Sequence, residues 1–353
     1  MRILVTGGAG FIGSALVRRL IGTTPAEVLN VDALSCTGNL ANVADVARSS
    51  RYAFMQADIG DARAMAGVLE RFTPDRIFHL AAETQVDRSI DDPLAFIQTN
   101  AIGTATLLQV AQTYWQRLSP AAREGFRLIH VSSDEVFGSI EPSERPTEAT
   151  PWNPNSPYAA SKAASDHFVR AWHRTYGLPT IVTHASNNYG PYQFPEKLIP
   201  LAILNALEGK PVRLYGSGLQ ERDWLHVDDH VDALLHIAQN ARPGSSHVIG
   251  GRSPRRNCDV VAAICGVLDR LVPESAHKPH ATLVEAVADR PGHDARHAVD
   301  DARLAAELGW TPRIGFEEGL LRTVAWYIAN RRWWIGARTR LHDGERLGLA
   351  RAG

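Results

Sequence analysis

Short apolar segments alternate with longer segments of helical pattern in the first half of the chain, and this alternation restricts the fold more than any other feature. The apolar segments, rich in branched residues, span 2–6, 28–31, 52–56, 76–80, 127–131 and 180–185. The helical segments include 11–21, 61–71, 94–117 and 157–176. Strands that alternate with helices form crossover units. The sequence therefore predicts an α/β fold built on a Rossmann-type, doubly wound parallel sheet with helices on both faces.

The pattern loosens from about residue 190, where loops rich in Pro and Gly separate the helical segments. Helices are expected near 197–208, 228–239, 258–271 and 315–329. We predict a Rossmann domain over residues 1–186 and a smaller, mixed α/β lobe over 187–330, with the chain able to cross between them again. Residues 331–353 carry six Arg against two acids, and we expect a partly ordered surface tail there.

Composition excludes several classes of protein. The chain has 353 residues, 44% of them hydrophobic, which suits a globular protein with a sizeable core. Its formal net charge is -1, so no broad field gathers nucleic acid or an acidic membrane. Cys36, Cys258 and Cys265 match neither a disulfide framework nor a zinc site. Since no signal-peptide pattern and no uninterrupted apolar run long enough for a bilayer occurs, we expect a soluble, cytoplasmic protein.

Three glycines, Gly7, Gly10 and Gly13, follow the first predicted strand, and a helical pattern begins among them. Glycines at this spacing let backbone N–H groups and a helix N-terminus approach a pyrophosphate. Asp32 closes the next apolar segment, where a carboxylate can bind the hydroxyls of an adenine ribose, unless it is only a turn residue. No Arg follows within five residues to bind a 2′-phosphate, so NAD is favoured over NADP. Asp58 repeats the placement after the next strand, or caps the helix beyond it.

A second pattern points to acid–base chemistry on a helix. Ser156 and Pro157 suit the N-cap and first position of a helix, so Tyr158 and Lys162 stand four residues apart on one face. An ammonium beside a phenol favours the phenolate. Lys162 is therefore expected to lower the pKa of Tyr158 and make it a proton acceptor. The spacing alone is common on solvated surfaces, and it is the glycine pattern that favours catalysis.

Two adjacent acids, Asp134 and Glu135, follow the apolar segment 127–131. Ser132 and Glu135 have the spacing of a capping box, but Gly138 and two nearby prolines leave no room for a long helix. Ligands of open parallel sheets bind at the carboxyl ends of the strands. We expect both acids in the cofactor crevice, which requires the backbone to turn here, because neighbours along a strand face opposite sides.

These motifs resemble those of the extended short-chain dehydrogenase/reductase family, whose NAD-dependent epimerases and dehydratases modify nucleotide sugars. The resemblance begins with TGGAGFIG (6–13) and YAASK (158–162). Further segments resemble the dTDP-glucose 4,6-dehydratases of that family: HLAAETQVDRSI (79–90), SSDEVFG (132–138), SNNYGPYQFPEKLIPLAILNALEGK (186–210), RDWLHVDDH (222–230) and VADRPGHDARHAVD (287–300). Together the motifs span roughly residues 1–330.

The resemblance implies residues for cofactor, substrate and catalysis. NAD is expected to contact Gly7, Gly10, Phe11, Ile12, Gly13, Asp32, Ser35, Asp58, Ile59, Leu80, Ala81, Ala82, Thr84, Thr99, Tyr158, Lys162 and Asn188. The nucleotide sugar dTDP-glucose is expected to contact Thr84, Ser133, Asn187, Lys197, Leu198, Tyr215, Arg222, Asn257, Asp289, Arg290 and His293. The implied catalytic residues are Ser133, Asp134, Glu135, Tyr158 and Lys162.

It also implies the reaction of a hydro-lyase. NAD oxidises C4 of the hexose, Glu135 removes the C5 proton, and Asp134 protonates the C6 hydroxyl as it leaves. Hydride then returns to C6 and gives a 4-keto-6-deoxy sugar. Ser133 stands where the family usually has Thr, and it keeps the hydroxyl that can share a proton with Tyr158. The family's homodimers imply pairing of the helices at 94–117 and 157–176 across a two-fold axis.

Several alternatives stay open. A UDP-sugar 4,6-dehydratase differs in its substrate by one methyl, and a UDP-sugar 4-epimerase or decarboxylase shares the glycines, Tyr158 and Lys162. An epimerase has no elimination to perform, so the adjacent acids count against it. A non-catalytic NAD-binding regulator would need neither the acids nor the Tyr and Lys pair.

Some positions depart from the residues frequent in the family, namely Gln85, Cys36, Phe137 and the segment 183–186. They fall at the edges of the expected pocket rather than on reacting groups, so they bear on the substrate more than on the chemistry. His226 and His230 have a spacing that suits a metal, but no third ligand cluster accompanies them, and we expect no metal site.

Overall fold

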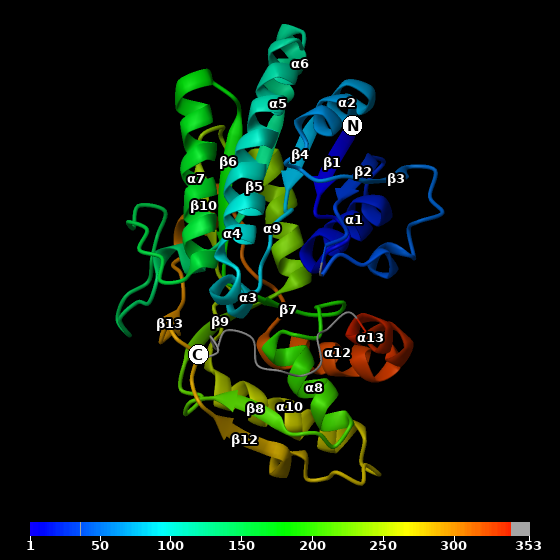
Figure 1. Ribbon diagram of the computed structural model, residues 1–353, viewed down its shortest axis with the longest axis vertical. Helices are drawn as coiled ribbons and strands as arrows, with labels where there is room; N and C mark the ends of the chain where they lie inside the picture. The colour runs from blue at the N-terminus through cyan, green and yellow to red at the C-terminus, as the bar shows by residue number, and fades with distance from the viewer. Residues whose placement is uncertain (36, 340–353) are drawn as a thin grey trace.

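A seven-stranded parallel sheet forms the centre of the molecule in the computed structural model, which describes residues 1–35 and 37–339 (Figure 1). Its strands follow the order β10-β6-β5-β4-β1-β2-β3. They are β1 (Arg2–Thr6), β2 (Glu27–Asp32), β3 (Tyr52–Gln56), β4 (Arg76–His79), β5 (Arg127–Ser133), β6 (Thr180–Ala185) and β10 (Ser246–Ile249). The strand order reverses between β1 and β4, so this is the doubly wound, Rossmann-type sheet that the sequence predicts.

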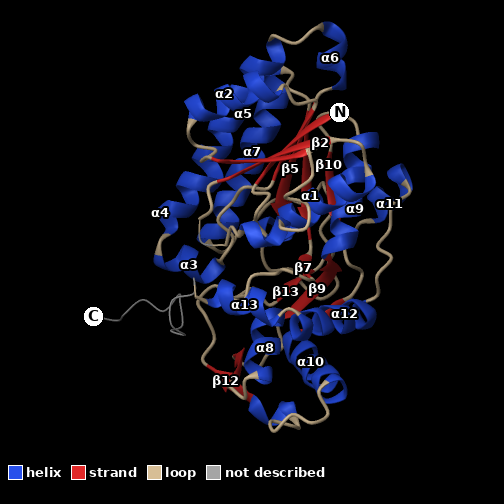
Figure 2. Ribbon diagram, turned by 90° about the vertical axis from the view of Figure 1, so that its right-hand side faces the viewer, coloured by secondary structure: helices blue, strands red, loops and turns tan. Residues whose placement is uncertain are grey.

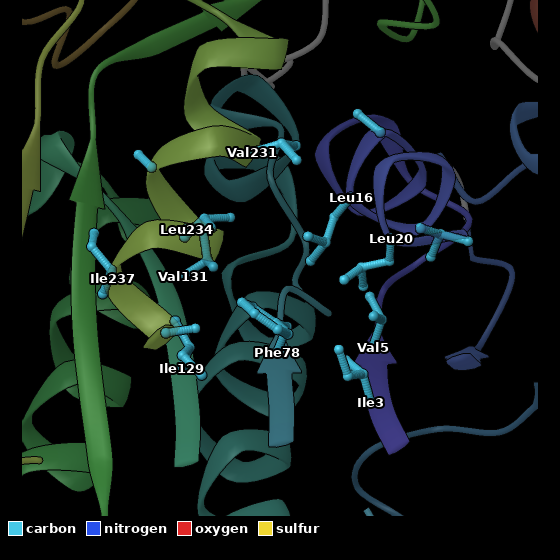
Figure 3. Close-up of a cluster of buried hydrophobic side chains, with 14 of the residues drawn as sticks. Ile3, Val5, Leu16, Leu20, Phe78, Ile129, Val131, Val231, Leu234 and Ile237 are labelled. Carbon is cyan, nitrogen blue, oxygen red and sulfur yellow. The ribbon is translucent and has the colours of Figure 1, made fainter. Parts of the chain in front are cut away.

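Helices cover both faces of the sheet, as Figure 2 shows. The main ones are α1 (Phe11–Thr23) and α9 (Val227–Asn240) on one face, and α2 (Ala62–Phe72), α5 (Thr104–Gln116) and α7 (Pro157–Tyr176) on the other. Alternate residues of β1 face the two helix layers. Ile3 and Val5 face α1 (Figure 3), in a core to which α9 also contributes, and Leu4 lies in the core that contains α2 and α5. Burial on both faces explains why these strands are near-continuous apolar runs.

The long helical stretch predicted at 94–117 is present but not uniform. It consists of α4 (Pro93–Phe96), the π-helical segment η2 (Ile97–Gly103) and α5, with α3 (Val86–Asp91) before it and α6 (Pro120–Gly125) after it. Within the described residues, Pro93–Gln116 is the one stretch long and apolar enough to cross a membrane by length and composition. Half of its most apolar window is buried, with α2 and α7 as neighbours. Such burial is typical of a core helix.

A smaller lobe lies beyond the carboxyl ends of the sheet strands (Figure 1). Its helices share a second core, and they are α8 (Leu198–Leu207), α10 (Asn257–Leu271), α12 (Phe316–Ala329) and α13 (Arg331–Arg338). One small sheet joins β7 (Asn187–Tyr189), β9 (Glu221–His226), β11 (Pro254–Arg256) and β13 (Arg296–His297), and β8 (Val212–Tyr215) pairs with β12 (Val284–Val287). The remaining elements are α11 (Ala302–Leu308) and the short helices η1 (Leu40–Val43), η3 (Asp134–Phe137) and η4 (His280–Leu283).

The predicted organisation differs from the structure near the C-terminus. A surface tail was expected from residue 331, but Arg331–Arg338 form helix α13. Trp334 of that helix is 3% exposed because its ring packs in the second core. Its Nε1 donates to the Tyr327 carbonyl at 3.0 Å. The rest of the predicted tail, 340–353, lies outside the described residues, as does Cys36. The chain crosses between the lobes again, as the prediction allowed: it returns to the sheet through α9 and β10, so neither lobe is continuous in sequence.

Candidate active site

The turn after β1 brings the backbone closer to helix α1 than a side chain would allow. Gly7 has φ +73°, and a Cβ on it would lie 2.6 Å from Ala81 N. A Cβ on Gly13 would lie 2.1 Å from the Gly7 carbonyl oxygen. Gly10 is the N-cap of α1 and offers no side-chain acceptor to the first N–H groups of the helix. Uncapped N–H groups beside a glycine turn are the arrangement that binds a pyrophosphate.

Asp32 ends β2 beside this turn. Its Oδ2 accepts from Ala9 N at 2.9 Å and its Oδ1 from Leu34 N at 2.8 Å, and the residue is 8% exposed. Burial raises the pKa of Asp32, and the two backbone hydrogen bonds oppose this rise. The carboxylate is thus fixed in place. Asp58 does not cap α2, whose N-cap is Asp61.

One cavity of about 300 Å³ joins the glycine turn to the end of β5. All seventeen residues predicted to contact NAD line it, as do the five predicted catalytic residues and, from the substrate set, Asn187 and Lys197. Side chains at Gly7 and Gly13 would clash with the backbone of the turn beside α1, the space that a pyrophosphate would use. Asp32 lines the cavity at the end of β2, where its carboxylate can bind the hydroxyls of an adenine ribose. These features fit a dinucleotide such as NAD.

The two acids enter this cavity because the chain turns at the end of β5. Ser133 is the N-cap of the 3-10 helix η3, and its Oγ accepts from Glu135 N at 3.2 Å. Gly138, with φ +74°, ends the turn. The cap is therefore Ser133, and the alternative capping box from Ser132 to Glu135 does not form. Both Asp134 and Glu135 line the cavity.

The surroundings of Asp134 favour the protonated form of its carboxyl group. It is 4% exposed, and its Oδ2 has no hydrogen-bond partner among the described residues. Burial, and next the charge of Glu135, raise the pKa of Asp134 well above its usual range, while Arg222 opposes the rise. A carboxyl that keeps its proton near neutral pH can act as a general acid.

Tyr158 and Lys162 lie on the buried face of α7, 7% and 4% exposed. Lys162 Nζ donates to the Val131 carbonyl at 2.9 Å. Burial lowers the pKa of Lys162 to about 8. Burial and Glu135 raise the pKa of Tyr158, although Ser133 lowers it. Burial and the neighbouring acids thus raise the net pKa of Tyr158 in this arrangement, and the lowering expected from Lys162 stays a prediction.

Seven residues predicted to hold the nucleotide sugar lie outside the cavity lining: Leu198, Tyr215, Arg222, Asn257, Asp289, Arg290 and His293. Two of them meet at Asp87, because Tyr215 OH donates to its Oδ2 at 3.1 Å and Arg290 Nη1 to its Oδ1 at 2.8 Å. His293 Nδ1 lies 2.6 Å from Asp289 Oδ1. Tyr215, Asp289, Arg290 and His293 thus all lie in the smaller lobe. Leu198 begins α8 and packs on the second core.

The two other polar candidates, Arg222 and Asn257, also lie in the smaller lobe. Arg222, 5% exposed, donates to the carbonyls of Glu221 at 2.9 Å and Asp294 at 2.8 Å. Asn257 begins α10, and its Oδ1 is buried without a hydrogen-bond partner in the described part of the chain. An unpaired buried amide oxygen and a buried guanidinium are groups that a polar ligand can satisfy.

Three further residues of the site were not predicted. Asp87 organises the substrate residues, and its pairing exists only in the folded chain. His230 lines the cavity with Nδ1 2.9 Å from Asn188 Oδ1. Asp166 follows Lys162 on α7, and the repeat of polar residues every four positions was its signal in the sequence. Residues 1–35 and 37–339 hold no group of three or more His, Cys, Asp or Glu side chains placed to bind a metal ion.

The family model for GDP-mannose 4,6 dehydratase matches residues 4–323. A probable dTDP-glucose 4,6-dehydratase of Sinorhizobium fredii is 53% identical over 349 residues, which are 99% of this chain and 99% of the relative. dTDP-glucose 4,6-dehydratase 1 of Escherichia coli is 52% identical over 342 residues, 94% of each chain. The chain therefore belongs to the GDP-mannose 4,6 dehydratase family.

Solved structures agree with this assignment. The dTDP-glucose 4,6-dehydratase of Bacillus anthracis, in complex with NAD, has a TM-score of 0.85 and 41% identity over 96% of this chain and 99% of that one. A UDP-glucose 4-epimerase of Thermus thermophilus, also in complex with NAD, has a TM-score of 0.81 and 29% identity over 94% of this chain and 100% of that one. Dehydratases and epimerases share the fold, so the site must distinguish them.

Proposed function

We propose that the protein is an NAD-dependent hydro-lyase that acts as a dTDP-glucose 4,6-dehydratase. The observation that carries this proposal is the acid pair Asp134 and Glu135, which η3 turns into the same cavity as Tyr158. An elimination needs an acid and a base beside the site of oxidation, whereas an inversion at C4 does not. Full-length relatives named dTDP-glucose 4,6-dehydratase support the choice of substrate.

The cavity would hold NAD along its length. The glycine turn and the N-terminus of α1 would bind the pyrophosphate, and Asp32 the adenine ribose. NAD, when bound, would accept hydride from C4 and return it to C6. The positive charge of its nicotinamide ring would also oppose the rise that the neighbouring acids cause in the pKa of Tyr158. Thr99, Asn188 and the segment Leu80–Ala82 line the walls of this site.

Three side chains would divide the proton transfers. Tyr158, with the Ser133 hydroxyl beside it, takes the proton of the C4 hydroxyl. Glu135 removes the C5 proton, which the C4 ketone has made acidic. Asp134, whose pKa burial and Glu135 raise, gives its proton to the C6 hydroxyl, so that it leaves as water. Hydride return to C6 gives a 4-keto-6-deoxy sugar.

The sugar nucleotide would extend from the acids toward the smaller lobe. Lys197 lies between them: its Nζ donates to the Thr84 carbonyl at 2.8 Å, and burial lowers its pKa. Asn187 Oδ1 is buried and unpaired among the described residues, and so is Arg290 Nε. These groups, with Arg222 and the cluster around Asp87 and Asp289, would bind the nucleotide and its two phosphates.

Product analysis with two donors tests this function. The protein, NAD and either dTDP-glucose or UDP-glucose are incubated, and the nucleotide sugars are weighed by mass spectrometry. We expect dTDP-glucose to lose the mass of one water and to be consumed faster than UDP-glucose. A product of unchanged mass would indicate inversion, and no consumption of either donor would refute the proposal.

We further propose a cytoplasmic homodimer. Leu94, Ile97 and Ile102 are 72%, 45% and 46% exposed on the helical stretch that lies beside α7, and a second copy of this face would cover them. The free thiols Cys258 and Cys265 suit a reducing compartment. Light scattering after size exclusion should give the mass of two chains, and Leu94→Glu should lower it; a monomeric wild type would contradict the dimer.

A further inference from the structure

Helix α7 carries a third buried polar side chain on the face that holds Tyr158 and Lys162. Asp166 follows Lys162 by about one helical turn and is 0% exposed. A carboxylate removed from water this completely is destabilised unless partners satisfy it. The proton transfers proposed above do not use Asp166.

Three side chains of the sheet fix this carboxylate. Asp166 Oδ2 accepts from Ser132 Oγ at 2.9 Å and lies 3.0 Å from His184 Nε2. Its Oδ1 lies 3.2 Å from His130 Nε2. Ser132 and His130 come from β5 and His184 from β6, so two neighbouring strands hold it. Burial raises the pKa of Asp166, but the two histidines outweigh burial and keep the pKa below its usual range. Asp166 is therefore an anion.

Lys162 is the cation of the same cluster. Its Nζ donates to the Val131 carbonyl, between the two β5 residues that hold Asp166. Burial lowers the pKa of Lys162, and the charge of Asp166 opposes that fall. Burial and then Lys162 lower the pKa of His130 to about 4.

The other titratable groups around the cluster do not replace Asp166 as the counter-ion. Burial, His130 and Lys162 together lower the pKa of His79 on β4 well below its usual range, so this ring is neutral. His184 on β6 and Tyr158 on α7 carry no negative charge at neutral pH. The acids Asp134 and Glu135 lie in η3 at the end of β5, and they act on the pKa of Tyr158 rather than on that of Lys162.

We propose that Asp166, held by Ser132 and His184, is a positioning residue that keeps Lys162 protonated and in place beside Tyr158. Without this carboxylate, Lys162 would have the neutral rings of His79 and His130 near it and would lose its proton more readily. Tyr158 would then face two acids with no cation from its own helix. The statement about Lys162 stands on the structure alone, and its consequence for turnover rests on the proposed function.

The four lysines of the chain, at 162, 197, 210 and 278, make the test direct. Full-length protein carrying 13C-labelled lysine is titrated by NMR, and Lys162→Met assigns the signal of Lys162. In Asp166→Asn the midpoint of the Lys162 titration should fall by about 1–3 pH units, as expected when a close opposite charge is removed. An unchanged midpoint would overturn the proposal.

The matched control is Asp232→Asn, which removes a carboxylate of α9 that lies 3.5 Å from Arg19. It should leave the Lys162 midpoint unchanged, and an equal fall in both variants would show a general charge effect and overturn the assignment. If Asp166→Asn does not fold, the double variant Asp166→Asn, His184→Asn places two amides in the cluster and takes its place, with the same expected fall.

Turnover of dTDP-glucose supplies a second readout. Lys162 acts as a cation, so activity is lost as pH rises through its pKa. The alkaline limb of kcat should therefore move to lower pH in Asp166→Asn, with activity recovered on acidification. A loss of kcat that is equal at all pH values would show a purely structural role. Absence of turnover by the wild type would refute the proposed function, while the NMR midpoint would still decide the role of Asp166.

Discussion

The turn between β1 and α1 leaves no room for a side chain at Gly13, so Gly13→Ala perturbs the cofactor site at one atom. The added Cβ would lie 2.1 Å from the oxygen of Gly7 and 2.9 Å from the Cα of Gly8, where real Cβ atoms keep 3.0 Å or more. These atoms belong to the backbone, so no rotamer change relieves the clash. Helix α1 must therefore move away from the turn by about 1 Å, which is the difference between the 2.1 Å contact with the Gly7 oxygen and the 3.0 Å that Cβ atoms require.

Overpacking of this kind costs about 1–3 kcal/mol of folding free energy. If NAD binding must restore the original cradle, the same energy raises the Kd for NAD by about 5- to 150-fold. Gly22→Ala is the matched control in the same helix, because its Cβ meets nothing within 4 Å. It should stabilise the protein by about 0.5–1 kcal/mol and leave the Kd unchanged. Urea unfolding and calorimetric titration with NAD measure both quantities; equal NAD affinity in the two variants would refute the cradle.

Three further predictions follow from the acids and from α13. Glu135→Gln should still allow NAD reduction by dTDP-glucose but slow water loss by about 10²–10⁴-fold, as seen by NADH absorbance and product mass; wild-type dehydration would remove Glu135 from its role. Burial raises the pKa of Asp134 in the fold, so the wild type loses stability as pH rises from the usual Asp range through that raised pKa. Asp134→Asn should therefore be more resistant to urea than wild type at neutral pH, with an advantage that shrinks on acidification; an advantage that grows would contradict this sign. Trp334→Ala should cost about 3–5 kcal/mol, whereas Ile335→Ala, at a position 47% exposed, should change stability by about 0.5 kcal/mol or less in the same unfolding assay; equal losses would contradict the packing of α13.

The sheet and its helices could be predicted wherever the signal is local. Helix α7 begins and ends as predicted, because Ser156 Oγ accepts from Ala159 N at 3.1 Å and Pro157 opens the first turn. At its end Gly177 adopts φ +75°, which a glycine accepts without strain. The strands β1, β3 and β6 likewise match apolar runs with clear polar ends.

The missed elements depend on contacts that the local sequence does not encode. Strand β10 has four residues, and its place at the sheet edge comes from pairing with β6, far away in the chain. Helix α13 has an Arg-rich sequence, and only the second core shows that Trp334 is buried.

The charged clusters were missed for a related reason. His130 and His184 occur in strands buried on both faces, where the period of two carries no information about which side a residue faces. Their common partner Asp166 is visible only once α7 is packed on the sheet. The same holds for Asp87, which joins Tyr215 and Arg290 across more than one hundred residues of sequence.

The account turns on the claim that hydride removed from C4 returns to C6 of the same sugar after water has left. dTDP-glucose carrying deuterium at C4 tests this claim directly. NMR of the product should show deuterium at C6, loss of the C6 hydroxyl and a solvent-derived proton at C5. Deuterium retained at C4 of an inverted sugar, or dehydration without label at C6, would contradict it.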